Sequence, residues 1–225
     1  MPRSVITTTV AAPTSHVLLD LAIFKNDWAV TTTADDAFLT RAITRCSVFA
    51  ETYCKRTFGV QTLQDSITLR RDKWPFILKE RPDPLQLSAW PLVAIASVTE
   101  DGTVLTLGTD FAADMDAGQL YRLNEWGTER EWRGVSIVVV YQAGYVLPDD
   151  TNLYSPMPQP LPLDLQDAVS RMTYTRYAER QRDPLLKSEY VDGVGRAEYI
   201  VSSPDGNLSP DVEDILAKYR VPTVA

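Results

Sequence analysis

The sequence predicts an α+β protein: a bundle of about three to four helices, with a mostly antiparallel β region inserted between helix two and helix three. Apolar residues recur at helical spacing before residue 56 and after residue 162. Between residues 60 and 145 the apolar stretches are short and are separated by Pro, Gly and Asp clusters, as expected for strands and turns. A projecting arm over 183–208 and a C-terminal helix and tail over 209–225 complete the expected order.

A core of helices and strands is expected over residues 20–182, preceded by an extended or flexible lead over residues 1–19. Asp20 is suited to cap a short helix over 21–29, and Thr33 is suited to cap a long helix over 34–55. The long helix has the clearest periodicity in the chain. Its apolar stripe contains Leu39, Ala42, Ile43, Cys46, Phe49, Ala50 and Tyr53.

Two segments define the β region. Glu100-Asp101-Gly102-Thr103 is typical of a hairpin turn of the Asp-Gly kind. The stretch Ser136–Tyr145 is apolar on both faces, which predicts a strand covered by a layer on each side. Gly144 allows the chain to turn after this strand.

Five prolines between residues 148 and 162 predict an extended surface crossover into a third helix over 163–181. The apolar side of this helix contains Leu165, Ala168, Val169 and Met172. Tyr174 and Tyr177 lie off that side. They are expected either to contact a neighbouring subunit or to cover the sheet of their own subunit.

The arm carries two short apolar and aromatic strings on either side of a glycine bend, which predicts a projecting hairpin or an extended segment. Its candidate contact residues are Tyr190, Val191, Gly193, Gly195, Tyr199 and Ile200.

The C-terminal helix has Ser209 as its expected N-cap and Pro210 at its first position. Its candidate docking residues are Val212, Ile215, Leu216, Tyr219 and Arg220. An amphipathic helix of this length needs a surface to pack on. That surface is either a groove of a partner or the core of its own subunit.

Composition excludes several function classes. A formal net charge of −8 argues against a protein that grips nucleic acid, and no apolar run is long enough to span a membrane. The Thr-rich N-terminal segment has no apolar core typical of a secretory signal, so the chain is expected to be made in a cytoplasm.

No residue pattern indicates catalysis, a metal or a cofactor. His16 is the single histidine, and no Cys-x-x-Cys or His-x-x-x-His spacing occurs. Cys46 and Cys54 are expected to be packing thiols on one helix. The chain is therefore not expected to be an enzyme.

Tryptophans offer a different class of function. Trp74, Trp90, Trp126 and Trp132 all fall in the β region. On one exposed surface they would make an aromatic platform for carbohydrate, so a carbohydrate-binding β module is the alternative hypothesis.

Three phrases occur in a particular order. Tyr53-Cys-Lys-Arg-Thr-Phe58 ends the long helix, Tyr141-Gln-Ala-Gly-Tyr145 ends the last strand of the β region, and a Val-x-x-x-Leu-x-x-Tyr-Arg phrase covers Val212–Arg220. In this order and spacing the chain resembles the ring-forming head-to-tail connector (adaptor) proteins of long-tailed bacteriophages.

This resemblance implies a structural protein of the virion neck, made in the host cytoplasm. It implies a homo-oligomeric ring of about twelve copies that docks on the portal protein and connects the capsid to a stopper or other neck protein. DNA would pass through the lumen without specific binding. The C-terminal helix would dock on the portal, and the arm would contact the ring or the neck.

Overall fold

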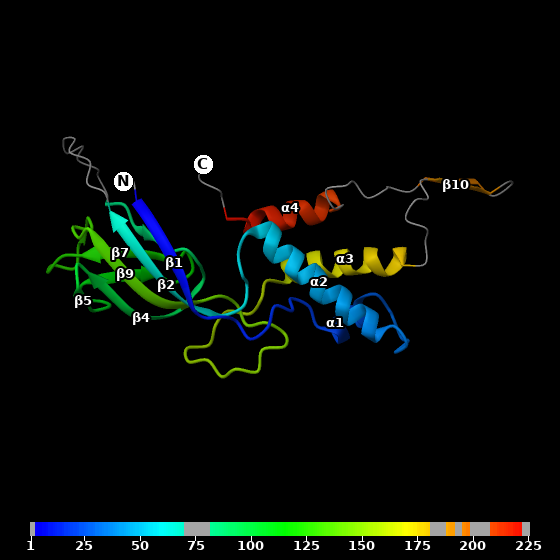
Figure 1. The fold of residues 1–225 in the computed structure, drawn as a ribbon, viewed down its shortest axis with the longest axis horizontal. Coiled ribbons are helices and arrows are strands. Elements are labelled where there is room, and N and C mark those ends of the chain that lie inside the picture. The colour runs from blue at the N-terminus through cyan, green and yellow to red at the C-terminus, as the bar shows by residue number, and fades with distance from the viewer. Residues whose placement is uncertain (1–2, 70–81, 181–187, 192–194, 199–207, 222–225) are drawn as a thin grey trace. The chain divides into compact units, whose positions relative to one another are not determined.

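The computed structural model describes residues 3–69, 82–180, 188–191, 195–198 and 208–221 (Figure 1). The chain divides into two compact units. The β unit contains Met1–Ser15, Phe58–Val146 and Asp150–Pro160, and the helical unit contains His16–Thr57, Leu147–Asp149 and Leu161–Ala225. The α+β prediction, with the β region between the second and third helices, is confirmed.

The described residues of the β unit form two sheets, and both are antiparallel, in agreement with the predicted mostly antiparallel region. The larger sheet has the order β1-β2-β9-β4-β5, and the smaller has the order β3-β7-β6 with β8 paired to β7. The strands are β1 (Arg3–Ala11), β2 (Gln61–Leu69), β3 (Leu85–Gln86), β4 (Leu92–Glu100), β5 (Thr103–Leu105), β6 (Phe111–Asp114), β7 (Gln119–Leu123), β8 (Glu129–Arg130) and β9 (Ser136–Ala143).

Both sheets contribute to one hydrophobic core. Along β2 and β9 every second side chain is buried, because alternate residues of a strand point to opposite faces. The buried members include Leu63, Ile67, Leu85, Leu87, Val98, Phe111, Leu120, Trp132, Ile137, Val139 and Tyr141.

A polar contact lies inside this core. The Tyr141 hydroxyl on β9 donates to Asp65 Oδ2 on β2 at 2.9 Å, and the Ser88 amide donates to the same oxygen at 2.8 Å. Tyr141 and Asp65 both have no exposed surface. The buried carboxylate therefore joins the central strands to the segment that follows β3.

The N-terminal segment is more ordered than the expected lead. Residues 3–11 form β1, an edge strand paired antiparallel with β2 from Arg3 opposite Leu69 to Ala11 opposite Thr62. Residues 5–10 are all β-branched, which restricts their side-chain rotamers and favours a strand.

Turn chemistry explains two further features. The predicted hairpin joins β4 to β5, with positive φ at Asp101 (47°) and Gly102 (83°), as a two-residue hairpin turn requires. Gly144 follows β9 with φ 130°. A Cβ there would lie 2.5 Å from the carbonyl oxygen of Gly59, so the two backbones approach closely.

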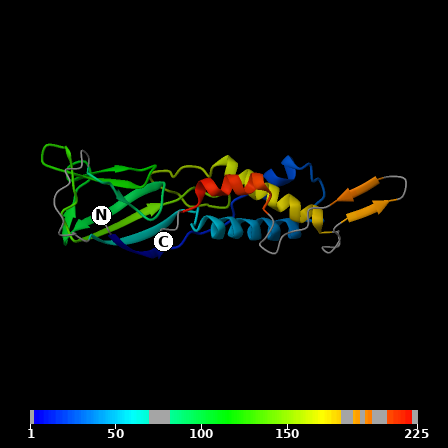
Figure 2. The same cartoon turned by 90° about the horizontal axis from the view of Figure 1, so that it is seen from above.

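The helical unit is built from α1 (Leu21–Asp27), α2 (Asp36–Cys54), α3 (Leu163–Glu179) and α4 (Pro210–Tyr219). Asp20 caps α1, as predicted, by accepting from the Ala22 amide. The cap assignment for the long helix was wrong: its N-cap is Asp35 rather than Thr33. Helix α2 contacts α1, α3 and α4, and α4 also contacts α3. Figure 2 shows α4 running beside α2 and α3.

The arm contains β10 (Ser188–Val191) and β11 (Gly195–Glu198), which pair antiparallel as a two-stranded sheet. Tyr190 pairs with Arg196, and Val191 pairs with Gly195. The predicted hairpin is therefore seen in the backbone. Three of its candidate contact residues, Gly193, Tyr199 and Ile200, lie outside the described residues.

We predict that Gly144→Ala destabilises the β unit by at least about 2 kcal/mol, because the new Cβ meets backbone atoms and the backbone is left-handed. Gly108→Ala is the matched control. It has φ +81° but no atom within 4 Å of the built Cβ, so its cost is about 1 kcal/mol. Chemical denaturation followed by circular dichroism measures both, and equal losses would contradict the close-approach argument.

Candidate assembly surfaces

Within the described part of the chain, no three His, Cys, Asp or Glu side chains are grouped so that they could hold a metal ion. His16 Nδ1 lies 2.7 Å from Glu51 Oε2, so this residue is held on α2. Cys46 and Cys54 are buried, as predicted for packing thiols, and burial raises the pKa of Cys54 to about 11. None of the helices seen in the described ranges is long and apolar enough to cross a bilayer.

The apolar face of α4 lies against its own helical unit. Val212 and Leu216, two of the predicted docking residues, are 1% and 0% exposed. The Tyr219 hydroxyl donates to Asp164 Oδ1 on α3 at 2.6 Å, and the Val221 amide donates to the Cys54 carbonyl at 3.0 Å. Of the two uses expected for this helix, these contacts correspond to closing its own core.

A second set of residues remains on the outer side of α4. Ile215 is half-buried and Arg220 is exposed, with its guanidinium 5.4 Å from the ring centroid of Tyr53. The exposed positions of α4 are Pro210, Asp211, Glu213, Asp214, Ala217 and Lys218. Because the apolar face of α4 is buried, a portal protein would meet the outer side of this helix. Portal docking itself stays a prediction.

Tyr174 and Tyr177 contact helical residues of the same chain. The Tyr174 ring stacks on Trp28, with centroids 3.8 Å apart and an interplanar angle of 11°. The Tyr177 hydroxyl donates to Asp35 Oδ2 at 3.0 Å. Their partners here are residues of the helical unit rather than a sheet. Tyr174 keeps 38% of its surface exposed, which leaves room for the predicted contact with a neighbouring subunit.

Arg180 and Asp35 form a clasp at the point where the chain leaves α3 for the arm. Arg180 Nη1 pairs with Asp35 Oδ1, and the guanidinium lies 5.6 Å from the Phe38 ring centroid and 5.0 Å from that of Tyr177. The hydrogen bond from Arg180 is the largest influence that lowers the pKa of Asp35 below its ordinary value. The clasp therefore holds the C-terminal end of α3 against the start of α2.

A cavity of ≈ 340 Å³ lies in the helical unit, among residues of α2 and α3 and the start of α4. It combines apolar and charged residues: Cys46, Phe49, Arg171, Met172, Thr175, Arg176, Glu179, Leu208, Ser209 and Val212. Sequence reasoning missed this cavity, because its lining comes from segments far apart in the chain.

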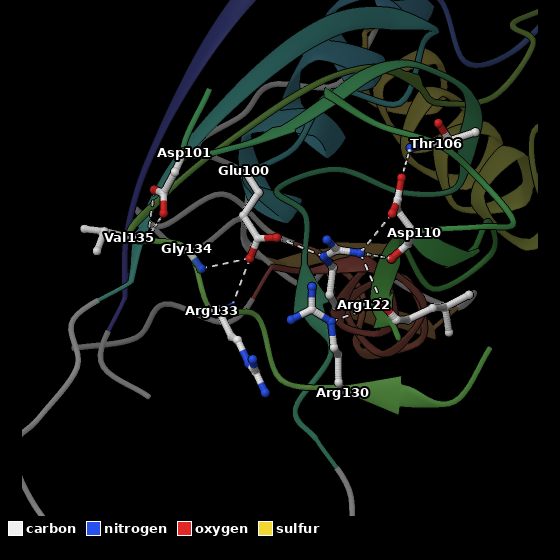
Figure 3. A network of polar contacts seen from close by, with 10 residues as sticks. Glu100, Asp101, Thr106, Asp110, Arg122, Arg130, Arg133, Gly134 and Val135 are labelled. Carbon is white, nitrogen blue, oxygen red and sulfur yellow. Dashed lines mark hydrogen bonds and ion pairs between the residues drawn. The ribbon is translucent and has the colours of Figure 1, made fainter. Parts of the chain in front are cut away.

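A polar network lies at one end of the β unit (Figure 3). Arg122 Nε donates to Glu100 Oε2 at 2.9 Å, and the amides of Arg133 and Gly134 donate to Glu100 Oε1 at 2.9 and 2.8 Å. Arg122 Nη1 also donates to the Leu123 carbonyl at 3.1 Å. Both carboxylate oxygens of Glu100 thus accept hydrogen bonds. This arrangement indicates a structural role, in which Glu100 links β7 to the segment before β9.

Burial by itself raises the pKa of Glu100. The hydrogen bonds from the Gly134 amide, Arg122 and the Arg133 amide outweigh this effect, so the pKa lies below its ordinary value. A Cβ at Gly134 would lie 2.5 Å from Glu100 Cγ, so a larger residue there would force the Glu100 side chain to shift.

The described tryptophans of the β region do not share one exposed surface. Trp132 is 7% exposed and belongs to the core, whereas Trp126 is 82% exposed between β7 and β8. Trp90 is half-buried, and Trp74 lies outside the described residues. A buried indole cannot offer its face to a sugar, so this arrangement gives the carbohydrate-platform hypothesis little support.

We predict that Glu100→Gln destabilises the β unit by about 3 kcal/mol, because it leaves the Arg122 charge buried without its closest counter-charge. The control is Asp167→Asn, which breaks the half-exposed pair with Arg171 and costs less than about 0.5 kcal/mol. Urea denaturation at neutral pH measures both, and a loss for Glu100→Gln no larger than the control's would show that the network is not stabilising.

We also predict that acid loosens the C-terminal end of α3. The folded-state pKa of Asp35 is lowered, so its contribution is present above the ordinary carboxyl pKa and is lost as pH falls through the lowered value. Hydrogen exchange in the last turn of α3 should therefore speed up in acid, after correction for the intrinsic rate. Asp35→Asn should remove this extra pH dependence, and an unchanged profile would contradict the assignment.

No protein-family model matches the chain, and a search of curated proteins found no match. Similar solved structures include a virion of a native gene transfer agent particle, at 17% identity and a TM-score of 0.49. They also include the neck of an empty particle with C6 symmetry and the neck of a native particle with C12 symmetry, each at 16% identity, with TM-scores of 0.48 and 0.46. Each comparison covers 98% of this chain and 97% of the other.

Proposed function

We propose that this chain is a structural subunit of a virion neck, assembled as a ring between a portal protein and the next neck protein, with no catalytic role. The order of elements carries the proposal. A short helix, a long helix, an antiparallel β region, a third helix, a hairpin arm and a C-terminal helix follow one another as the resemblance to connector proteins implies. The three phrases that carry the resemblance lie at the end of α2, at the end of β9 and on α4.

The arm supports a role in assembly. Its two strands pair with each other in a two-stranded sheet, and such a hairpin alone is marginally stable in water. A neighbouring subunit in a ring supplies the missing support, since ring contacts join two different surfaces of the same chain. The clasp between Asp35 and Arg180 holds the last described residue before the arm on the helical unit.

The portal contact in this proposal uses the outer side of α4 together with Arg220. Val212 and Leu216 hold the helix on its own unit, and Tyr219 fixes its C-terminal turn through Asp164. The helix is then presented as a rigid ridge, which lowers the entropy lost on binding.

Electron microscopy of particles from cells that make the chain tests the function, with gold-labelled antibodies raised against the purified protein. Label at the junction of head and tail is expected. Label at the tail tip, on the capsid surface or nowhere on intact particles would reject the proposal.

We predict different outcomes for the two sides of α4. Leu216→Ala removes a fully buried side chain and should destabilise the helical unit by about 2–5 kcal/mol. Lys218→Glu changes an exposed outer position and should leave the melting temperature unchanged while weakening attachment to portal-bearing capsids. Co-sedimentation with capsids and thermal melting measure the two effects. Unaltered capsid attachment by both Lys218→Glu and Arg220→Glu would argue against docking through this side.

A passive channel predicts weak DNA binding. With a net charge of −8 the chain gains little from neutralising phosphates, and each such contact would slow the passage of DNA. Fluorescence anisotropy with a short duplex at low salt should show no sub-micromolar binding. Tight binding by the purified chain would contradict a passive role.

A further inference from the structure

The large sheet of the β unit has two faces, and its register assigns each side chain to one of them. Residues directly opposite each other on antiparallel strands share a face. Leu63, Ile67 and Val139 mark the face that packs into the core. The alternate positions form the outer face: Ser4, Ile6, Thr8, Thr62, Gln64, Ser66, Thr68, Ala94, Ser97, Thr99, Val104, Ser136, Val138, Val140 and Gln142.

None of these outer-face residues is charged. The chain as a whole is 23% charged, so a face of this size would carry about three charged residues at the average frequency, and a water-facing sheet usually carries more. The charged side chains that the structure describes on these strands lie elsewhere, since Asp65 and Glu100 are both on the core side.

Apolar side chains occur at both margins and at the centre of this face. Ile6 on β1 is 66% exposed and Val104 on β5 is 70% exposed, while Val138 and Val140 between them are half-buried. The sequence predicted that β9 is covered on both sides. The core covers one side, and the outer side chains remain partly open to solvent.

The β1 edge of this sheet is also open. Strand β1 has β2 on one side and, among the described strands, none on the other. Residues 4–11 carry no charge and no proline, two of the features that usually blunt an exposed edge strand, and the one register shift in the β1–β2 pairing lies near its end, between Thr9 and Ala11. The regular part of this edge and the outer face thus form one continuous surface without charge.

We propose that the outer face of the large sheet, with the β1 edge, packs against a second copy of this chain. The inference rests on the ring function proposed above and names the surface through which copies meet. With a net charge of −8, two copies repel each other over much of their surfaces, and the repulsion is weakest where both lack charge. From strand spacing and rise the face measures roughly 600 Å², close to the ~800 Å² that each partner buries in a standard interface.

A protein partner fits this face better than DNA does. Exposed Ile6 and Val104 gain from apolar burial, and the face has no Lys or Arg to pair with phosphate. A second copy of this chain carries the same net charge of −8. Contact through an uncharged face reduces the repulsion between the two copies.

The test compares two neighbouring threonines of β1. Thr8 and Thr9 are both exposed, but Thr8 lies on the outer face and Thr9 lies on the side of Leu63. Thr8→Glu should weaken self-association of the full chain at least about tenfold, because it places like charges at the contact. Thr9→Glu should associate like the wild type. Sedimentation over a range of protein concentrations measures all three, and circular dichroism confirms that each is folded.

Cross-linking provides a second measurement on the same strand. Cys46 and Cys54 are buried, so a cysteine placed on β1 is the accessible thiol for a short bifunctional maleimide. Ile6→Cys should yield cross-linked oligomers, and Thr9→Cys should yield far fewer.

Each other outcome overturns the proposal. A wild-type chain that stays monomeric at every concentration rejects it, as do equal effects of Thr8→Glu and Thr9→Glu or equal cross-linking of the two cysteine variants. Retention of a DNA duplex that Thr8→Glu abolishes, with self-association unchanged, would assign the face to DNA. The electron microscopy of particles tests the ring function independently. If antibody label lies at the neck and Thr8→Glu self-associates like the wild type, only the proposed surface is rejected.

Discussion

The hydrogen bond from Tyr141 to Asp65 fixes the register on which the β unit depends. Both residues are fully buried, and burial keeps the pKa of the Tyr141 hydroxyl above its ordinary value, so the hydroxyl remains a proton donor. A slip of one residue between β2 and β9 would break this contact and turn every side chain of the slipped strand to the other face. The same bond that holds the core therefore decides which residues form the uncharged outer face.

Local patterns predicted the helices and the hairpin, because each depends on residues close together in sequence. The stripe on α2 and the Asp101-Gly102 turn are of this kind. Distant pairings left no such signal. Asp35 and Arg180 are 145 positions apart, so the clasp could not be read from the sequence, and Asp35 was passed over as the cap of α2. Strand β1 was missed as a strand because its Thr-rich run lacks the polar and apolar alternation that marks a half-buried strand.

Helix α4 shows why an apolar stripe alone cannot distinguish a docking helix from a core helix. Both need the same spacing, and only the packing of Val212 and Leu216 on α2 and α3 separates them. The β unit shows the converse case. Its outer face has no strong apolar stripe, and the informative signal is the absence of charge over five strands, which appears only after the register places the residues side by side.

The pairing of β1 with β2 has a consequence for synthesis on the ribosome. Thr7 lies opposite Asp65, so a strand made early must wait until α1 and α2 have been translated before its partner emerges. During that interval a run of consecutive β-branched residues is exposed, and such segments are prone to aggregate. Threonine retains the branched shape that favours the strand and adds a hydroxyl that water can solvate. The Thr7–Thr9 run thus lets the nascent chain keep its strand preference while lowering its tendency to stick to other chains before β2 arrives.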